Sequence, residues 1–94
     1  GFDLEKPAIL YYLKINKGMA YKIGITGNSL VERFRSDMQY IDVIKIWEYK
    51  VGEDAYIKEQ EILSDYVKFK YTGDYLLKSG NTELFNKDIL GLDV

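Results

Sequence analysis

The chain has 94 residues, 47% of them hydrophobic and 30% charged, which is typical of one folded domain spanning 1–94 and excludes a disordered chain. It contains no Cys and no His, which excludes disulfides, thiolate metal sites and the most common general base. No apolar run approaches the roughly 20 residues of a membrane span and no signal peptide is visible, so we expect an intracellular, cytoplasmic protein that does not contact membranes.

The formal net charge of -2 argues against a broadly basic surface for nucleic acid. The charge is uneven along the chain. Residues 1–36 carry six basic and three acidic side chains, whereas residues 37–94 carry seven basic and twelve acidic ones. A surface that faces phosphate is therefore expected in the first third of the chain, although short chains also acquire such asymmetry by chance.

The first predicted elements are two strands. Residues 8–15 are rich in aromatic and branched side chains, Asn-Lys-Gly at 16–18 indicates a turn, and residues 19–26 form a second apolar run, so 8–26 should be a β-hairpin. Alternation predicts one face made by Ile9, Tyr11, Leu13, Ile15, Tyr21, Ile23 and Ile25. The opposite face would carry Tyr12, Lys14, Lys22, Gly24 and Thr26.

A helix should follow the hairpin. Gly-Asn at 27–28 ends the second strand, and Ser29 followed by Glu32 has the spacing of a capping box. The helix is predicted over about residues 30–38, with apolar side chains at 30, 34 and 38.

Residues 41–50 predict a third strand, and residues 52–66 predict a second helix with acidic side chains near its start. Residues 67–79 fit no clear element, although Val-Lys-Phe-Lys-Tyr alternates as a short strand does. Residues 81–85 predict the start of a last helix. The order β-β-α-β-α indicates a small α/β (α+β) fold, with a three-stranded antiparallel sheet flanked by helices.

Two segments of the hairpin resemble the motifs that name the GIY-YIG nuclease superfamily. Residues 9–11 (Ile-Leu-Tyr) match the first motif, with Ile9 in place of its Gly, and residues 21–24 (Tyr-Lys-Ile-Gly) match a divergent form of the second. Family members join these motifs across a short turn, as here.

Later segments continue the resemblance, which covers about residues 8–86. Arg33 lies where the family places an arginine on the next helix, and Glu59 fits an Ala-x-x-x-Glu pattern on a later helix. Residues 80–85 (Gly-Asn-Thr-Glu-Leu-Phe) resemble the closing segment of a divergent phage and bacterial branch.

The resemblance implies an endonuclease that hydrolyses DNA phosphodiester bonds with the help of Mg²⁺ or Mn²⁺. It implies Tyr11, Tyr21, Arg33 and Glu59 as catalytic residues, with Glu59 as the metal ligand. Such hydrolysis needs a metal that polarises the phosphate, a base for water and a cation for the developing charge. Because His is absent, a Tyr hydroxyl is the expected proton acceptor, and its ordinary pKa of about 10 requires help from a nearby positive charge.

Other residues are expected to contact nucleic acid: Lys22, Gly24, Arg35 and Asn81. Arg33 suits phosphate better than Lys would because its planar fork offers two donors. Glu59 would lie on the apolar stripe of its helix, beside Ala55, Ile62 and Leu63, where a carboxylate is costly unless it is paired or binds a metal. Glu61 should instead be solvated.

Each assignment has a structural alternative. Tyr11 and Tyr21 could be ordinary strand aromatics, Tyr12 competes with Tyr11 for the first motif, and Gly24 could mark a β-bulge. Arg33 could pair with Asp37 at i+4, Asn81 could cap a helix, and Lys22 and Arg35 could face only water.

We therefore expect the catalytic part of a larger phage, restriction or mobile-element protein, whose DNA affinity comes from a separate domain or a second subunit. One alternative is a nucleic-acid-binding or interaction module with weak or no catalysis, which the absent His, the altered first Gly and the acidic total favour. A structural domain without a site is a further alternative. The nuclease requires Tyr11, Tyr21, Arg33 and Glu59 to converge on one exposed concavity.

Overall fold

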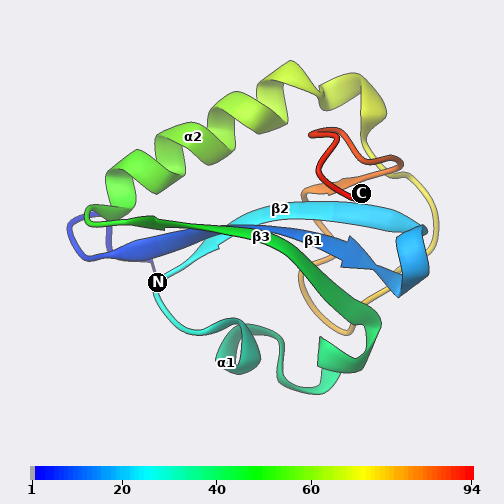
Figure 1. The fold of residues 1–94 in the computed structure, drawn as a ribbon, viewed down its shortest axis with the longest axis horizontal. Helices are drawn as coiled ribbons and strands as arrows, with labels where there is room; N and C mark the ends of the chain where they lie inside the picture. The colour runs from blue at the N-terminus through cyan, green and yellow to red at the C-terminus, as the bar shows by residue number, and fades with distance from the viewer. Residues whose placement is uncertain (1) are drawn as a thin grey trace.

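The computed structural model describes residues 2–94 and has the predicted α+β class (Figure 1). An antiparallel sheet contains four strands in the order β3-β1-β2-β4, one more strand than the sequence predicts. These strands are β1 (Ala8–Ile15), β2 (Ala20–Thr26), β3 (Ile41–Tyr49) and β4 (Leu84–Phe85). The helices are α1 (Leu30–Phe34) and α2 (Gly52–Asp65), and short 3-10 segments cover Asn16–Gly18, Arg35–Tyr40 and Val67–Phe69.

Two predicted helices differ from the observed elements. The predicted cap of α1 is confirmed, because the Ser29 hydroxyl accepts a hydrogen bond from the Glu32 amide at 3.2 Å. The helix nevertheless ends at Phe34, since Arg35 has a φ of 32° and the chain continues as a 3-10 turn. The helix predicted at 81–85 is wrong, because Leu84–Phe85 pair with β2 as a strand.

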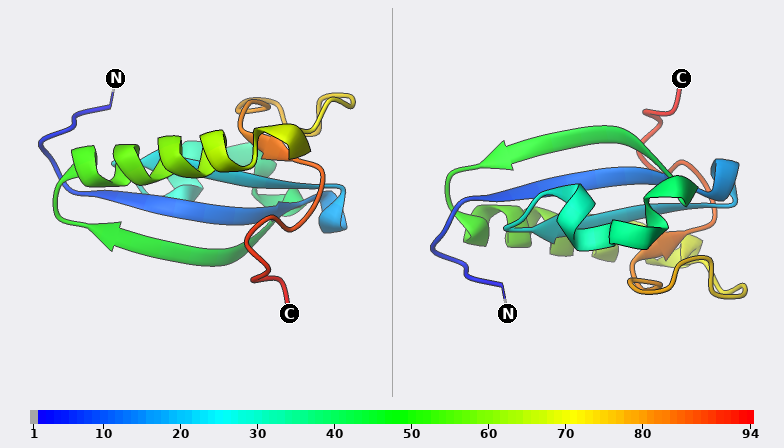
Figure 2. Two further views of the ribbon diagram at one scale, coloured as in Figure 1. Left: turned by 90° about the horizontal axis from the view of Figure 1, so that it is seen from above. Right: turned by 90° about the horizontal axis from the view of Figure 1, so that it is seen from below.

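Helices cover both faces of the sheet, so that the central strand β1 is buried on both sides. Figure 2 shows α2 crossing one face and α1 with its following turn lying on the other. We call these the α2 face and the α1 face. The core of the α1 face contains Tyr11, Leu13, Ile15, Ala20, Leu30 and Phe34, with others, and that of the α2 face contains Leu10, Tyr12, Tyr21, Ile23, Ile62, Phe85 and Ile89.

The register of the hairpin contradicts the predicted assignment of side chains to faces. Tyr11 pairs with Gly24, Leu13 with Lys22 and Ile15 with Ala20. Residues that pair across the hairpin point to the same face of the sheet. Because Ile15 pairs with Ala20, odd-numbered residues of β1 share a face with even-numbered residues of β2. Tyr21 therefore lies on the α2 face, whereas Lys22, Gly24 and Thr26 lie with Tyr11 on the α1 face.

Strand β3 forms an outer edge of the sheet and pairs only with β1. Its register shifts between Tyr12 and Leu13, which pair with Lys45 and Val43, so that Ile44 is an extra residue in a β-bulge. None of the helices within residues 2–94 combines the length and the apolar character needed to cross a membrane.

The C-terminal segment is fastened to the α2 face by two tyrosines whose rings stack at 6.0 Å. The Tyr12 hydroxyl donates to Asp88 at 2.6 Å, and the Tyr21 hydroxyl donates to Asp93 at 2.7 Å. Lys14 pairs with the same Asp93 carboxylate at 3.0 Å. The hydrogen bond to Asp93 favours the neutral phenol and raises the pKa of Tyr21 to about 12. Tyr12 and Tyr21 are thus accounted for by structural roles.

Replacing Tyr12 with Phe should lower the free energy of unfolding by about 1 kcal/mol, because one hydrogen bond is lost while the ring keeps its packing. Urea unfolding followed by circular dichroism would measure the change. Tyr75→Phe is the matched control, since Tyr75 is 86% exposed. Equal stabilities of the two variants would contradict the role assigned to Tyr12.

Candidate functional site

The Tyr11 ring lies across Gly24 on the α1 face. A Cβ atom built at Gly24 would come within 2.3 Å of the Tyr11 hydroxyl oxygen, so this strand position requires glycine. Tyr11 is only 2% exposed, and its ring meets that of Phe34 edge-on at 5.5 Å. The bulge alternative for Gly24 is wrong, because the pairing of β1 with β2 is regular there.

Three charged groups from separate parts of the chain act on the Tyr11 phenol. Burial raises the pKa of Tyr11 to about 12, the Arg33 guanidinium opposes this rise, and the Glu59 and Glu83 carboxylates add to it. The phenol therefore holds its proton firmly at neutral pH. Tyr12, the other candidate for the first motif, donates to Asp88 on the opposite face.

Arg33 projects from α1 over the Phe34 ring, with its guanidinium carbon 4.8 Å from the ring centroid. The alternative pairing with Asp37 is wrong. Asp37 is 2% exposed, and its carboxylate accepts hydrogen bonds from the backbone amides of Lys78 and Ser79. Within residues 2–94 no carboxylate lies within 4.0 Å of Arg33, so its donors are available to an anion.

Lys22 is the second cation of this cluster and is 1% exposed. Its ammonium donates to the Thr82 carbonyl at 2.7 Å and lies 3.5 Å from the Glu83 carboxylate. Burial lowers the pKa of Lys22, Arg33 lowers it further, and Glu83 and Glu59 oppose the decrease. The sequence pattern placed Lys22 on the wrong face and therefore missed that it belongs with Tyr11.

Glu59 occupies the apolar stripe of α2, as predicted. It is 9% exposed and has Ala55 and Ile62, both buried, as its helical neighbours. Burial raises the pKa of Glu59; a hydrogen bond from Gln60, at 3.2 Å, and the charge of Lys22 oppose the rise. Glu61 is exposed, as predicted, and pairs with Lys58.

A segment formed by residues 70–83 covers the cluster. Gly80 has a φ of 75°, and a Cβ there would approach the Arg33 Nη2 atom at 3.1 Å and the Lys22 Cε atom at 3.5 Å. Its backbone therefore lies directly against both cations. Asn81, predicted to contact nucleic acid, instead accepts hydrogen bonds from the Leu76 and Leu77 amides at 2.9 Å.

The remaining predicted residues do not join the cluster. Tyr21 lies on the opposite face, so the expected convergence of Tyr11, Tyr21, Arg33 and Glu59 on one exposed concavity is wrong. Arg35 is exposed beyond the end of α1. Sequence reasoning noted residues 80–85 only for their resemblance to a closing segment of the family, and it did not name Gly80, Thr82 or Glu83 as site residues. Among residues 2–94, no three acidic side chains are grouped closely enough to hold a metal ion together. A metal ion at Glu59 would therefore have this one carboxylate as its acidic protein ligand.

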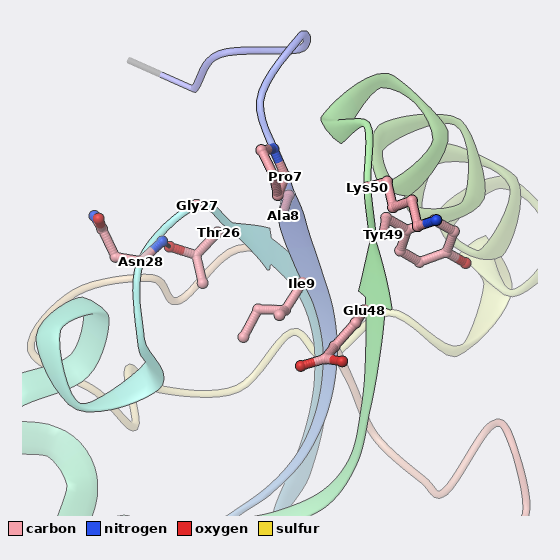
Figure 3. Close-up of a pocket in the computed structure, with 9 residues that line it drawn as sticks. All are labelled: Pro7, Ala8, Ile9, Thr26, Gly27, Asn28, Glu48, Tyr49 and Lys50. Carbon is pink, nitrogen blue, oxygen red and sulfur yellow. Dashed lines mark hydrogen bonds between the residues drawn. The ribbon is translucent and has the colours of Figure 1, made fainter.

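A cavity of about 480 Å³ opens on the same sheet near the cluster (Figure 3). Its floor includes Ile9 and Thr26, which form the next cross-strand pair on the face of Tyr11 and Gly24. The full lining is Pro7, Ala8, Ile9, Thr26, Gly27, Asn28, Glu48, Tyr49 and Lys50. The cavity thus lies at the end of the strands and is lined by none of Tyr11, Lys22, Arg33 and Glu59.

No protein family, curated protein or solved structure matches this chain at a significant level. The resemblance to the GIY-YIG superfamily therefore rests on the sequence motifs alone.

Replacing Gly24 with Ala should destabilise the fold by about 1–3 kcal/mol, because the new methyl group collides with the buried Tyr11 ring. Gly27→Ala is the matched control. The nearest atom to a Cβ at Gly27 is 3.9 Å away, so its stability should stay within about 0.5 kcal/mol of wild type. Thermal and urea unfolding of both variants would decide, and an unchanged Gly24→Ala would contradict the packing described.

Alkaline pH should unfold the domain partly through Tyr11. The folded pKa of Tyr11 is about 12 and the unfolded value is 10.0, so its contribution to stability is complete below pH 10 and is lost as pH rises through 12. Tyr11→Phe should therefore lose less stability than wild type between these pH values. Urea midpoints measured at pH 9 and at pH 11.5 would test this, and parallel losses in both proteins would contradict it.

Proposed function

We propose that this chain is a metal-dependent endonuclease module that hydrolyses DNA phosphodiester bonds. The observation that carries the proposal is that Tyr11, Lys22 and Arg33, from β1, β2 and α1, gather on the α1 face. The charges of Arg33 and Glu59 act on the Tyr11 phenol and on the Lys22 ammonium, although Glu59 belongs to α2. Such concentrations of perturbed titratable groups occur preferentially at functional sites.

Each residue has a role that its surroundings support. Arg33, free of carboxylate partners within residues 2–94, would bind a phosphate oxygen pair, and Lys22 would add a second positive charge. Tyr11, protonated at neutral pH, would orient the attacking water. Tyr21 has no part in the proposal.

Glu59 suits a hard divalent cation. It is a nearly buried carboxylate with one hydrogen-bond donor, from Gln60, on its Oε1 atom. Mg²⁺ often binds proteins through one or two carboxylates and keeps several waters, so this donor set fits it, as it fits Mn²⁺. Glu59 would hold the cation, which would supply Lewis-acid polarisation of the phosphate.

Access to the cluster requires a change of conformation. Tyr11 and Lys22 are 2% and 1% exposed, and the Gly80 backbone lies against Lys22 and Arg33. Residues 70–83 would therefore have to move before a phosphate could contact these side chains. Because the module is acidic overall, a separate DNA-binding domain or a second subunit would supply much of the affinity.

The coverage of Tyr11 and Lys22 also favours a second candidate, a module that binds nucleic acid or another partner with weak or no catalysis. In that case the cluster would stabilise the fold around residues 70–83. Plasmid nicking with and without Mg²⁺ separates the candidates, since only the nuclease should convert supercoiled to open-circular DNA in a metal-dependent way.

Glu59→Gln should abolish metal-dependent nicking and leave the melting temperature equal or higher. The amide cannot replace the carboxylate as a metal ligand. Burial raises the pKa of Glu59, which means that the charged carboxylate is disfavoured there, so the neutral amide should not destabilise the fold. Glu61→Gln, on the exposed side of the same helix, is the matched control and should nick like wild type. Persistent nicking by Glu59→Gln, or its unfolding, would make Glu59 a structural residue.

A further inference from the structure

Lys22 presents an unusual arrangement, because a lysine is rarely buried so completely without a close ionic partner. Its ammonium has one short contact, the Thr82 carbonyl at 2.7 Å, and a longer one to Glu83 at 3.5 Å. Within residues 2–94, Glu83 supplies the only carboxylate within 4.0 Å of it. Glu83 therefore supplies the carboxylate nearest to the Lys22 ammonium within the described residues.

The backbone at Glu83 is held in a conformation that costs free energy. Its φ of 54° lies in the left-handed region, which non-glycine side chains seldom adopt. The Glu83 carbonyl accepts a hydrogen bond from the Ile23 amide, beside Lys22 in β2, and its carboxylate accepts one from the Thr82 hydroxyl. Backbone strain of this kind tends to persist where a side chain must be aimed at a functional group.

We propose that Glu83 is a positioning residue of the candidate site, which holds the Lys22 ammonium charged and fixed on the α1 face so that Lys22 and Arg33 together can bind one phosphate group. The proposal rests on the proposed function in taking these two cations as the phosphate-binding pair. Glu83 itself contacts Lys22 and Thr82 and has no assigned contact with substrate.

The other charged groups around Lys22 do not substitute for Glu83. Arg33, from α1, repels the ammonium, while Glu59, from α2, attracts it from beyond 4.0 Å. Tyr11, from β1, is neutral at neutral pH. Removing the Glu83 carboxylate leaves burial and Arg33 opposed only by Glu59, so Lys22 should lose its proton at a lower pH.

Two variants separate the carboxylate from the backbone turn. Glu83→Gln keeps the size of the side chain, and Glu83→Gly allows the left-handed φ without strain. Both should move the Lys22 titration, followed by NMR of ¹³C- and ¹⁵N-labelled lysine, to lower pH while the other lysines stay unchanged. Glu61→Gln removes an equal charge from an exposed position and should leave Lys22 unmoved.

The same variants should shift the alkaline limb of the pH profile for plasmid nicking to lower pH, because phosphate binding needs charged Lys22. An unmoved Lys22 titration in both Glu83 variants overturns the proposal whatever the nicking result. A shift that Glu61→Gln reproduces also overturns it. If the Glu83 variants shift the Lys22 titration and the wild-type protein does not nick DNA, the link between Glu83 and Lys22 is supported. The proposed nuclease function is then refuted instead.

Discussion

The register of the β1–β2 hairpin is the constraint on which the candidate site depends. A slip of one residue in either strand would send every side chain of that strand to the other face. The observed register sets Gly24 opposite Tyr11, where the missing side chain leaves room for the ring. It also puts Lys22 on the face that Arg33 reaches from α1. The pairing of β1 with β2 thus explains both why position 24 must be glycine and why Lys22 lies on the same face as Arg33.

The charges of the site balance one another. Arg33, Glu59 and Glu83 act electrostatically on both the Tyr11 phenol and the Lys22 ammonium. Burial favours the neutral forms of Tyr11, Lys22 and Glu59, and nearby charges of opposite sign oppose this at each of the three. A phosphate that brings negative charge and a metal ion that brings positive charge would preserve the balance, whereas either alone would disturb it. Under the proposed function, the site would act on a metal-bound phosphate and would contribute little general affinity for a polyanion.

The sequence predicted the parts of the fold that are encoded locally. Strands β1, β2 and β3 and helix α2 follow from apolar runs and turn residues, and the burial of Glu59 follows from its spacing to Ala55 and Ile62. The faces of the hairpin could not be predicted in this way. Both of its faces are apolar, so alternation does not show which side chains of β2 accompany Tyr11, and the answer depends on which residues pair across the turn.

Residues 70–83 were the least predictable part, because tertiary contacts determine their path. Asp37 holds the Lys78 and Ser79 amides, and Lys22 holds the Thr82 carbonyl, over long distances in sequence. Local sequence patterns do not predict contacts of this kind. The short β4 has the same origin, since its two residues become a strand only by pairing with β2. Lys22 and Glu83 consequently become interpretable as a pair only in three dimensions.

The bulge at Ile44 has a consequence for how the protein behaves at high concentration. An unpaired edge such as β3 exposes backbone donors and acceptors to which another chain could add a strand. The extra residue interrupts the regular spacing of these groups, and Asp42, Lys45 and Glu48 place charges along the exposed strand. A neighbouring molecule would meet an irregular, charged border. These features disfavour the addition of a second strand at the outer side of the sheet, although Val43 and Ile46 expose apolar surface there.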